Sequence, residues 1–111
     1  MKHRIEQKGA GIVVFLEGDV DLQSSPRARD VLLEAVERSD RVVVDLSAVG
    51  YIDSSGIAAL VEALQRSRQR PAGSTLALAA VSDPVLRVLK LARLDRVFTI
   101  HPTLADALTQ T

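Results

Sequence analysis

The sequence predicts an α/β fold, a small mixed or parallel β-sheet of about five strands with about four helices. Two observations predict it. Short apolar stretches alternate along the chain with segments in which apolar residues recur at helical spacing. Residues 41–46 form a largely β-branched run, which is typical of a strand covered on both faces. Because strands alternate with helices, we expect parallel connections with right-handed crossovers.

Five segments have the pattern of strands. Residues 3–7 resemble a short edge strand that turns at residues 9–11 into a stronger one. A later apolar run follows each of the first three helices that the spacing predicts. The expected strands are 3–7, 12–17, 41–46, 75–80 and 97–100.

Four segments have helical spacing. The first is 27–37, with Ser25 as the expected N-cap and Pro26 at the first helical position. The second begins within Gly50–Leu60 and ends at residues 71–73; the third runs from residues 82–84 to about 91, and the last from 102–103 to about 108. The expected buried stripe of the second helix is Ile57, Leu60, Val61 and Leu64, with Glu62 and Arg66 on its outer face.

Composition limits the classes of function. The 111 residues correspond to one domain, 1–111, of which 47% are apolar, and the formal net charge is zero. We expect neither nucleic acid nor an anionic membrane as the main partner, because both select basic surfaces. The chain has no cysteine, which excludes disulfides and thiolate metal sites. No signal peptide and no apolar run long enough to span a bilayer are present, so we expect a cytoplasmic protein.

Polar residues cluster in three turns that follow strands, at 19–25, 47–55 and 82–83. In open α/β sheets, functional groups gather beyond the carboxyl ends of the strands. The middle turn carries Asp53, Ser54, Ser55 and Gly56 directly before a helix. On local chemistry alone, Asp53 or Ser54 could be no more than an N-cap of that helix.

The spacing of the polar residues does not favour an enzyme. The order Ser54, Asp95, His101 imitates a hydrolase triad, but no G-x-S-x-G nucleophile elbow surrounds the serine. His101 is expected to be an ordinary strand-end residue. The chain contains no glycine-rich phosphate-binding loop and no metal-ligand spacing, so we expect no cofactor and no metal.

Two further interpretations are weaker. Asp45, with Asp19 and Asp21 as magnesium ligands, imitates the phosphoacceptor site of a two-component receiver domain, but the last strand lacks the required lysine. Asp45 is therefore interpreted as a turn residue. The basic segment 66–70 contains no interleaved aromatic residue, so we interpret it as a solvated helix end and not as a nucleic-acid site.

The segment DLSAVGYIDSSGIAAL resembles the signature of STAS domains, the module shared by anti-sigma factor antagonists and the tails of sulfate transporters. Residues 53–56 match the family motif D-S-S/T-G in full. GDVDL at 18–22 is similar to the family's G-x-x-D motif and carries Asp21, and LDRVFTI at 94–100 is similar to the family's carboxyl-terminal part. The resemblance covers nearly the whole chain.

The resemblance implies a phosphorylation switch. In free-standing antagonists the first serine of the motif, here Ser54, is phosphorylated by a partner that is both anti-sigma factor and serine kinase, and a phosphatase reverses the step. The unphosphorylated form binds the anti-sigma factor and the phosphorylated form does not. The implied partner-binding residues are Asp21, Asp53, Ser54, Ser55 and Gly56.

The resemblance leaves some points open. Similar single-domain STAS proteins brace the ATPase of lipid-trafficking ABC transporters without a kinase, although the intact motif favours the switch. The oligomeric state is open as well. Ser24 and Ser25, expected to be exposed at another helix start, are the competing phosphorylation sites. A phosphate on Ser54 is expected to meet free N–H groups at the start of its helix and therefore not to unfold it.

Overall fold

The computed structural model describes residues 1–70 and 73–109 and contains one five-stranded sheet in the order β1-β2-β3-β4-β5. Strand β1 is antiparallel to β2, and β2 to β5 run parallel to one another. The strands are β1 (Lys2–Lys8), β2 (Gly11–Val20), β3 (Arg41–Ile52), β4 (Thr75–Ala79) and β5 (Thr99–His101). The mixed, mostly parallel sheet confirms the predicted fold class.

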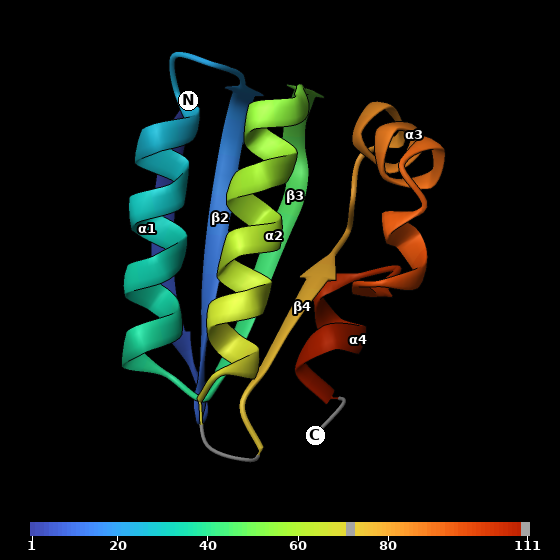
Figure 1. Ribbon diagram of the computed structural model, residues 1–111. Coiled ribbons are helices and arrows are strands. Elements are labelled where there is room, and N and C mark those ends of the chain that lie inside the picture. Colours follow the sequence, from blue (N-terminus) through green and yellow to red (C-terminus); the bar gives the residue numbers. More distant parts are fainter. Residues whose placement is uncertain (71–72, 110–111) are drawn as a thin grey trace.

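The helices connect the parallel strands. Figure 1 shows α1 and α2 side by side across one face of β2 and β3, with the amino-terminal end of α2 beside the arrowheads of both strands. The helices are α1 (Ser25–Arg38), α2 (Ser54–Arg68), α3 (Asp83–Leu91) and α4 (Leu104–Thr109), with a short 3₁₀ turn, η1 (Leu94–Arg96). The predicted end of the second helix at residues 71–73 falls partly on Pro71 and Ala72, which lie outside the described residues.

Apolar side chains cover the middle of the sheet on both faces. Towards α1 and α2, the buried valines of β2 and β3 join the main core, to which Leu60 of α2 also belongs. On the other face Val13, Val43 and Ala79 pack with Ala107 of α4. The prediction that the third strand is covered on both sides is confirmed, because successive side chains of a strand point to opposite faces.

Strands β2 and β3 are longer than their predicted ranges. Their parallel pairing continues, with two register shifts, as far as the pair Val20 and Ile52. The strand was predicted to end at Leu46 because polar residues follow it in the sequence. Hydrogen bonding to the neighbouring strand nevertheless keeps the backbone extended through these polar residues. Residues 47–52, predicted as part of a turn, are therefore strand.

Three details at helices and the last strand also differ from the predictions. Helix α1 begins at Ser25 and its N-cap is Ser24, one residue before the expected cap. The last strand is shifted to Thr99–His101. In α2, Leu60 and Leu64 are buried as expected, but Ile57 and Val61 are only partly buried, whereas Ala59 and Ala63 are buried.

The shift of this stripe has a physical cause. Helix α2 packs against α1 as well as against the sheet. A helix with two packed sides buries the small residues between them, which a single-stripe pattern does not capture. Within the described parts of the chain, no helix is long and apolar enough to cross a bilayer.

Candidate functional site

The three polar turns meet at the carboxyl edge of the sheet. The amide of Asp53 donates to the carbonyl of Val20 at 3.2 Å, which joins the start of α2 to the end of β2. The hydroxyl of Ser82, directly before α3, donates to the carbonyl of Val49 in β3. Residues from three distant parts of the sequence therefore form one surface, as the parallel topology requires.

Asp53 is the N-cap of α2. Its Oδ1 accepts hydrogen bonds from the amides of Ser55 at 2.9 Å and Gly56 at 3.1 Å, and from the Ser55 hydroxyl. The amide of Leu22, in the β2–α1 turn, also donates to this carboxylate. One side chain thus satisfies helix-end donors and holds a neighbouring turn.

These contacts lower the pKa of Asp53. The largest contribution is the hydrogen bond from the Ser55 hydroxyl, and the backbone amides of Gly56, Ser55 and Leu22 lower the pKa further. Partial desolvation acts in the opposite direction. Because all these donors favour the ionised form, Asp53 is a carboxylate at neutral pH.

Ser54 is the first residue of α2 and its side chain is exposed. The two serines expected to compete with it are less accessible. Ser25 is only 8% exposed, and the half-buried Ser24 hydroxyl accepts from the Asp21 amide and donates to the carbonyl of Asp19. The expectation that Ser24 and Ser25 are exposed was wrong, because the turn before α1 folds back on itself.

Asp21 organises that turn. Its Oδ1 accepts from the amides of Gln23 and Ser24, both at 3.1 Å, and its carbonyl accepts from the amide of Ser25 at 2.7 Å. An aspartate that binds its own downstream backbone in this way stabilises a turn. The predicted partner-binding residue is therefore also a turn former.

Gly56 is required by packing. A Cβ atom at this position would lie 2.6 Å from Cγ1 of Ile52 and 2.7 Å from the backbone oxygen of Val20. The glycine lets the first turn of α2 approach the ends of β2 and β3 closely. It thereby fixes the position of Ser54 relative to the sheet edge.

Asp45 does not lie in a turn, which corrects the prediction. It is 6% exposed within β3, opposite Phe15 and Ala79, and its Oδ1 accepts from the amide and hydroxyl of Ser47. Asp19 lies further along, at the carboxyl end of β2, opposite Tyr51. The carboxylates of the receiver interpretation therefore lie at different levels of the sheet.

The triad interpretation also finds no support. Ser54 starts α2, Asp95 lies in η1 and His101 ends β5; in the described part of the chain these three make no hydrogen bond to one another. Among residues 1–70 and 73–109, no group of three or more His, Asp or Glu side chains could hold a metal ion. His101 is a strand-end residue, as predicted.

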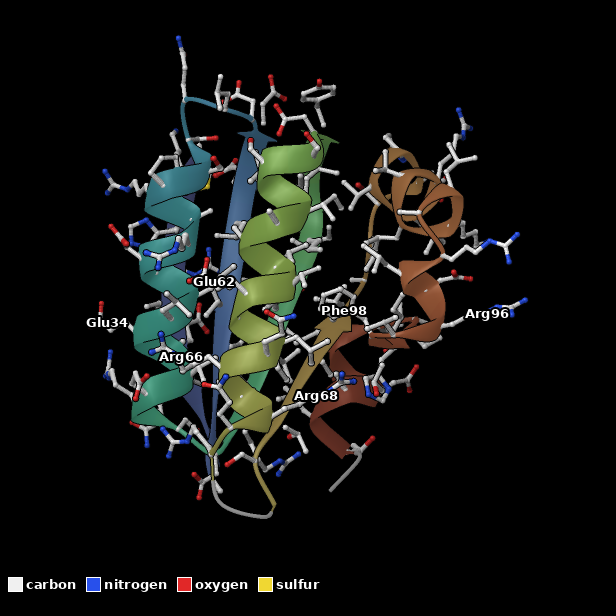
Figure 2. All side chains as sticks on the ribbon, viewed as in Figure 1. Glu34, Glu62, Arg66, Arg68, Arg96 and Phe98 are labelled. Carbon is white, nitrogen blue, oxygen red and sulfur yellow. The ribbon has the colours of Figure 1, made fainter. Side chains whose placement is uncertain are left out.

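The basic segment is the carboxyl end of α2, as predicted, with Arg66 and the exposed Arg68 in its last turn, but two of its arginines also bind α1. Nη1 of Arg66 pairs with Glu37 of α1 at 2.6 Å, and Arg70 binds backbone carbonyls at the end of α1. Glu62 pairs with Arg29 of α1 at 2.7 Å. Figure 2 shows Glu62 and Arg66 on the side of α2 that faces α1.

Two features of the surface could not be predicted from the pattern of apolar residues in the sequence. A cleft of about 450 Å³ is lined in part by Phe15, Asp45 and Ser47, but by none of the residues of the Asp53–Gly56 turn. At the carboxyl edge, Leu22 and Tyr51 are exposed apolar side chains. Exposure of this kind depends on which elements meet and is not visible in local periodicity.

Comparison with known proteins agrees with this geometry. The family model described as "STAS domain" matches residues 3–107. The chain is 31% identical over 91 residues to the "Anti-sigma-B factor antagonist" of Listeria monocytogenes, an alignment that covers 80% of this chain and 77% of the relative.

Solved structures are similar as well. An anti-sigma factor antagonist from Mycobacterium paratuberculosis superposes with a TM-score of 0.86 at 27% identity, over 97% of this chain and 91% of that one. The Bacillus cell fate determinant SpoIIAA in its phosphorylated form has a TM-score of 0.72 at 15% identity, over 96% of each chain, and is similar in fold.

Proposed function

The chain belongs to the STAS domain family, and we propose that it is an anti-sigma factor antagonist whose binding is switched by phosphorylation of Ser54. One observation carries the proposal. Ser54 is the exposed serine at the start of α2, on the sheet edge where the turns after β2, β3 and β4 meet. The relatives named as anti-sigma factor antagonists, and a structural neighbour solved in a phosphorylated form, support the assignment.

In this proposal the chain is a binding module and not an enzyme. The partner is an anti-sigma factor that also acts as a serine kinase, and a phosphatase removes the phosphate. The residues proposed to contact the partner are Asp21, Asp53, Ser54, Ser55 and Gly56. Residues 1–111 act as one domain, in the cytoplasm where the partner and the transcription machinery lie.

The cap at Asp53 refines how the phosphate would act. The amides of Ser55 and Gly56, which the sequence suggested would be free to meet the phosphate, already bind Asp53. The helix therefore keeps its cap whether or not Ser54 is modified. The phosphate adds roughly −1.5 to −2 charges at neutral pH, next to an ionised Asp53.

The phosphate on Ser54 would therefore act on the interface with the partner and not on the fold. A partner that covers Ser54 closely would have to desolvate this dianion or stay away from it, and burying an uncompensated charge is costly. A cost of about 1.4 kcal/mol is enough to weaken binding tenfold. We therefore expect phosphorylation to weaken binding without unfolding the domain.

The test uses the full chain and its cognate kinase. We expect mass spectra of the reacted protein to place one phosphate on Ser54, with no phosphate on Ser54→Ala and unchanged phosphate on the control Ser47→Ala, an exposed serine of β3. Phosphorylated protein should lose at least about tenfold in affinity for the anti-sigma factor and keep its helical circular dichroism and melting temperature. Ser54→Asp should reproduce the loss only in part, because it carries less charge.

Three outcomes would contradict the proposal. Phosphate on Ser54→Ala protein would show that another residue is the acceptor. Unchanged affinity after phosphorylation would exclude the switch. Binding of the unmodified chain to an ABC transporter ATPase, with no effect of Ser54→Ala, would instead indicate the bracing role known among similar proteins.

A further inference from the structure

Four large apolar side chains are exposed among residues 1–70 and 73–109. Leu22 is 75% exposed and Tyr51 53% exposed, and both lie at the carboxyl edge of the sheet with Ser54. Leu91, 80% exposed, is the last residue of α3, and Val97, 41% exposed, follows η1. We propose that Leu22 and Tyr51 are the apolar anchors through which this edge binds the anti-sigma factor, an inference that rests on the proposed function.

Leu22 is held in place although its side chain is in solvent. Its amide donates to the carboxylate of Asp53, and the flanking turn is fixed by the hydrogen bonds of Asp21 to Gln23 and Ser24. An apolar side chain on a fixed backbone loses little conformational freedom when a partner covers it. The same hydrogen bond ties the position of Leu22 to the cap beside Ser54.

Tyr51 is fixed by the sheet. It lies in β3 opposite Asp19 of β2, two positions before the cap Asp53. Tyrosine supplies a large contact area with few rotatable bonds, which is why it is enriched among the residues that dominate binding energy at interfaces. A tyrosine on a strand next to the proposed phosphorylation site fits that role.

The charges around these anchors indicate the chemistry of the partner surface. Asp19, Asp21 and Asp53 place three carboxylates at the same edge. A complementary surface has an apolar depression for Leu22 and Tyr51, bordered by lysine or arginine side chains. A phosphate on Ser54 would bring a hydrated dianion to this contact and keep the apolar surfaces apart, which links the anchors to the switch.

The test compares alanine variants by titration calorimetry against the purified anti-sigma factor encoded in the same genome. We expect Leu22→Ala and Tyr51→Ala each to raise Kd by about tenfold or more, because truncating a buried interface anchor commonly has this effect. Leu91→Ala removes a leucine of similar exposure at the carboxyl end of α3 and should change Kd by less than about twofold. All three variants should retain the wild-type circular dichroism, since none of the side chains is buried.

The wild-type titration separates the two proposals. If the unmodified chain binds and neither Leu22→Ala nor Tyr51→Ala weakens it, the anchor assignment is wrong and the proposed function stands. A Leu91→Ala variant that loses as much affinity as Leu22→Ala would also overturn the assignment. If the unmodified chain does not bind the anti-sigma factor, both proposals fail.

Discussion

Asp53 combines two functions in one side chain. It caps α2 through the amides of Ser55 and Gly56, and it holds the β2–α1 turn through the amide of Leu22. The motif aspartate therefore has a structural reason to precede Ser54 even before any partner is considered. Its ionised form is the one that these donors favour, so its contribution to stability depends on pH.

The pH dependence of stability has a defined direction. The pKa of Asp53 is lowered in the folded state from its ordinary value of 3.8. The stabilisation that the ionised side chain gives to the folded state is therefore present above 3.8 and is lost as pH falls through the folded pKa. We expect Asp53→Asn to melt at a lower temperature than the wild type at pH 7, because the neutral amide lacks the negative charge that strengthens the hydrogen bonds accepted by Oδ1. The difference in melting temperature between the two proteins should become smaller as pH falls well below 3.8.

Thermal melts of both proteins from neutral to acid pH provide the measurement. The control is Asp95→Asn, which changes an exposed carboxylate in η1. Its difference in melting temperature from the wild type should not shrink at acid pH in this way. A gap between wild type and Asp53→Asn that is the same at all pH values would show that charge plays no part in the cap.

At the scale of the helices, α1 and α2 are joined along their length by side chains of opposite charge. Arg29 pairs with Glu62 and Arg66 with Glu37, at 2.7 and 2.6 Å. These pairs are exposed and each contributes little to stability. Arg70 differs, because its Nη1 donates to the carbonyls of Val36 and Glu37, two of the last acceptors of α1, while Nη2 pairs with Asp40.

We expect Arg70→Ala to lower the free energy of unfolding by roughly 1–3 kcal/mol, since carbonyls at the end of α1 lose a charged donor. Arg70→Lys should restore only part of this loss, because an ammonium cannot reproduce the planar fork of a guanidinium. Urea denaturation measures both values. The control is Arg68→Ala, whose guanidinium donates a long hydrogen bond of 3.4 Å to the Val97 carbonyl, and an equal loss there would contradict the capping role.

At the scale of the whole molecule, the buried residues of α3 are different from the residues proposed to bind the partner. The core side of α3 carries Val85 and Leu89, both fully buried, whereas the proposed binding residues lie at the carboxyl edge. Loss of a buried leucine leaves a cavity that the surrounding side chains fill only in part. Stability can therefore change while the binding edge keeps its structure.

We expect Leu89→Ala to lower the free energy of unfolding by about 2–5 kcal/mol. Leu91→Ala, on the same helix but exposed, should change it by less than about 0.5 kcal/mol. At a temperature where both variants are folded, their affinity for the anti-sigma factor should equal that of the wild type. A large loss of affinity in folded Leu89→Ala protein would show that α3 and the binding edge are coupled.

Much of this architecture was predictable because its signals are local. Helical spacing and β-branched runs follow from the geometry of single elements, so the number and order of strands and helices were correct. The placement of Ser54 at a strand-to-helix turn followed from the same patterns. Element ends were less predictable: β3 runs on through residues 47–52 because its neighbour β2 continues to pair with it.

The sequence by itself determined the α/β class, a mixed or parallel sheet and the D-S-S-G turn at the carboxyl edge. Tertiary structure decided how that edge is arranged. It placed the Leu22 amide on Asp53, folded Ser24 inward, left Ser54 accessible and brought Tyr51 to the same edge. The physical reason is that hydrogen bonding and exposure at a turn depend on which distant segments meet there, whereas periodicity reports only on the segment itself.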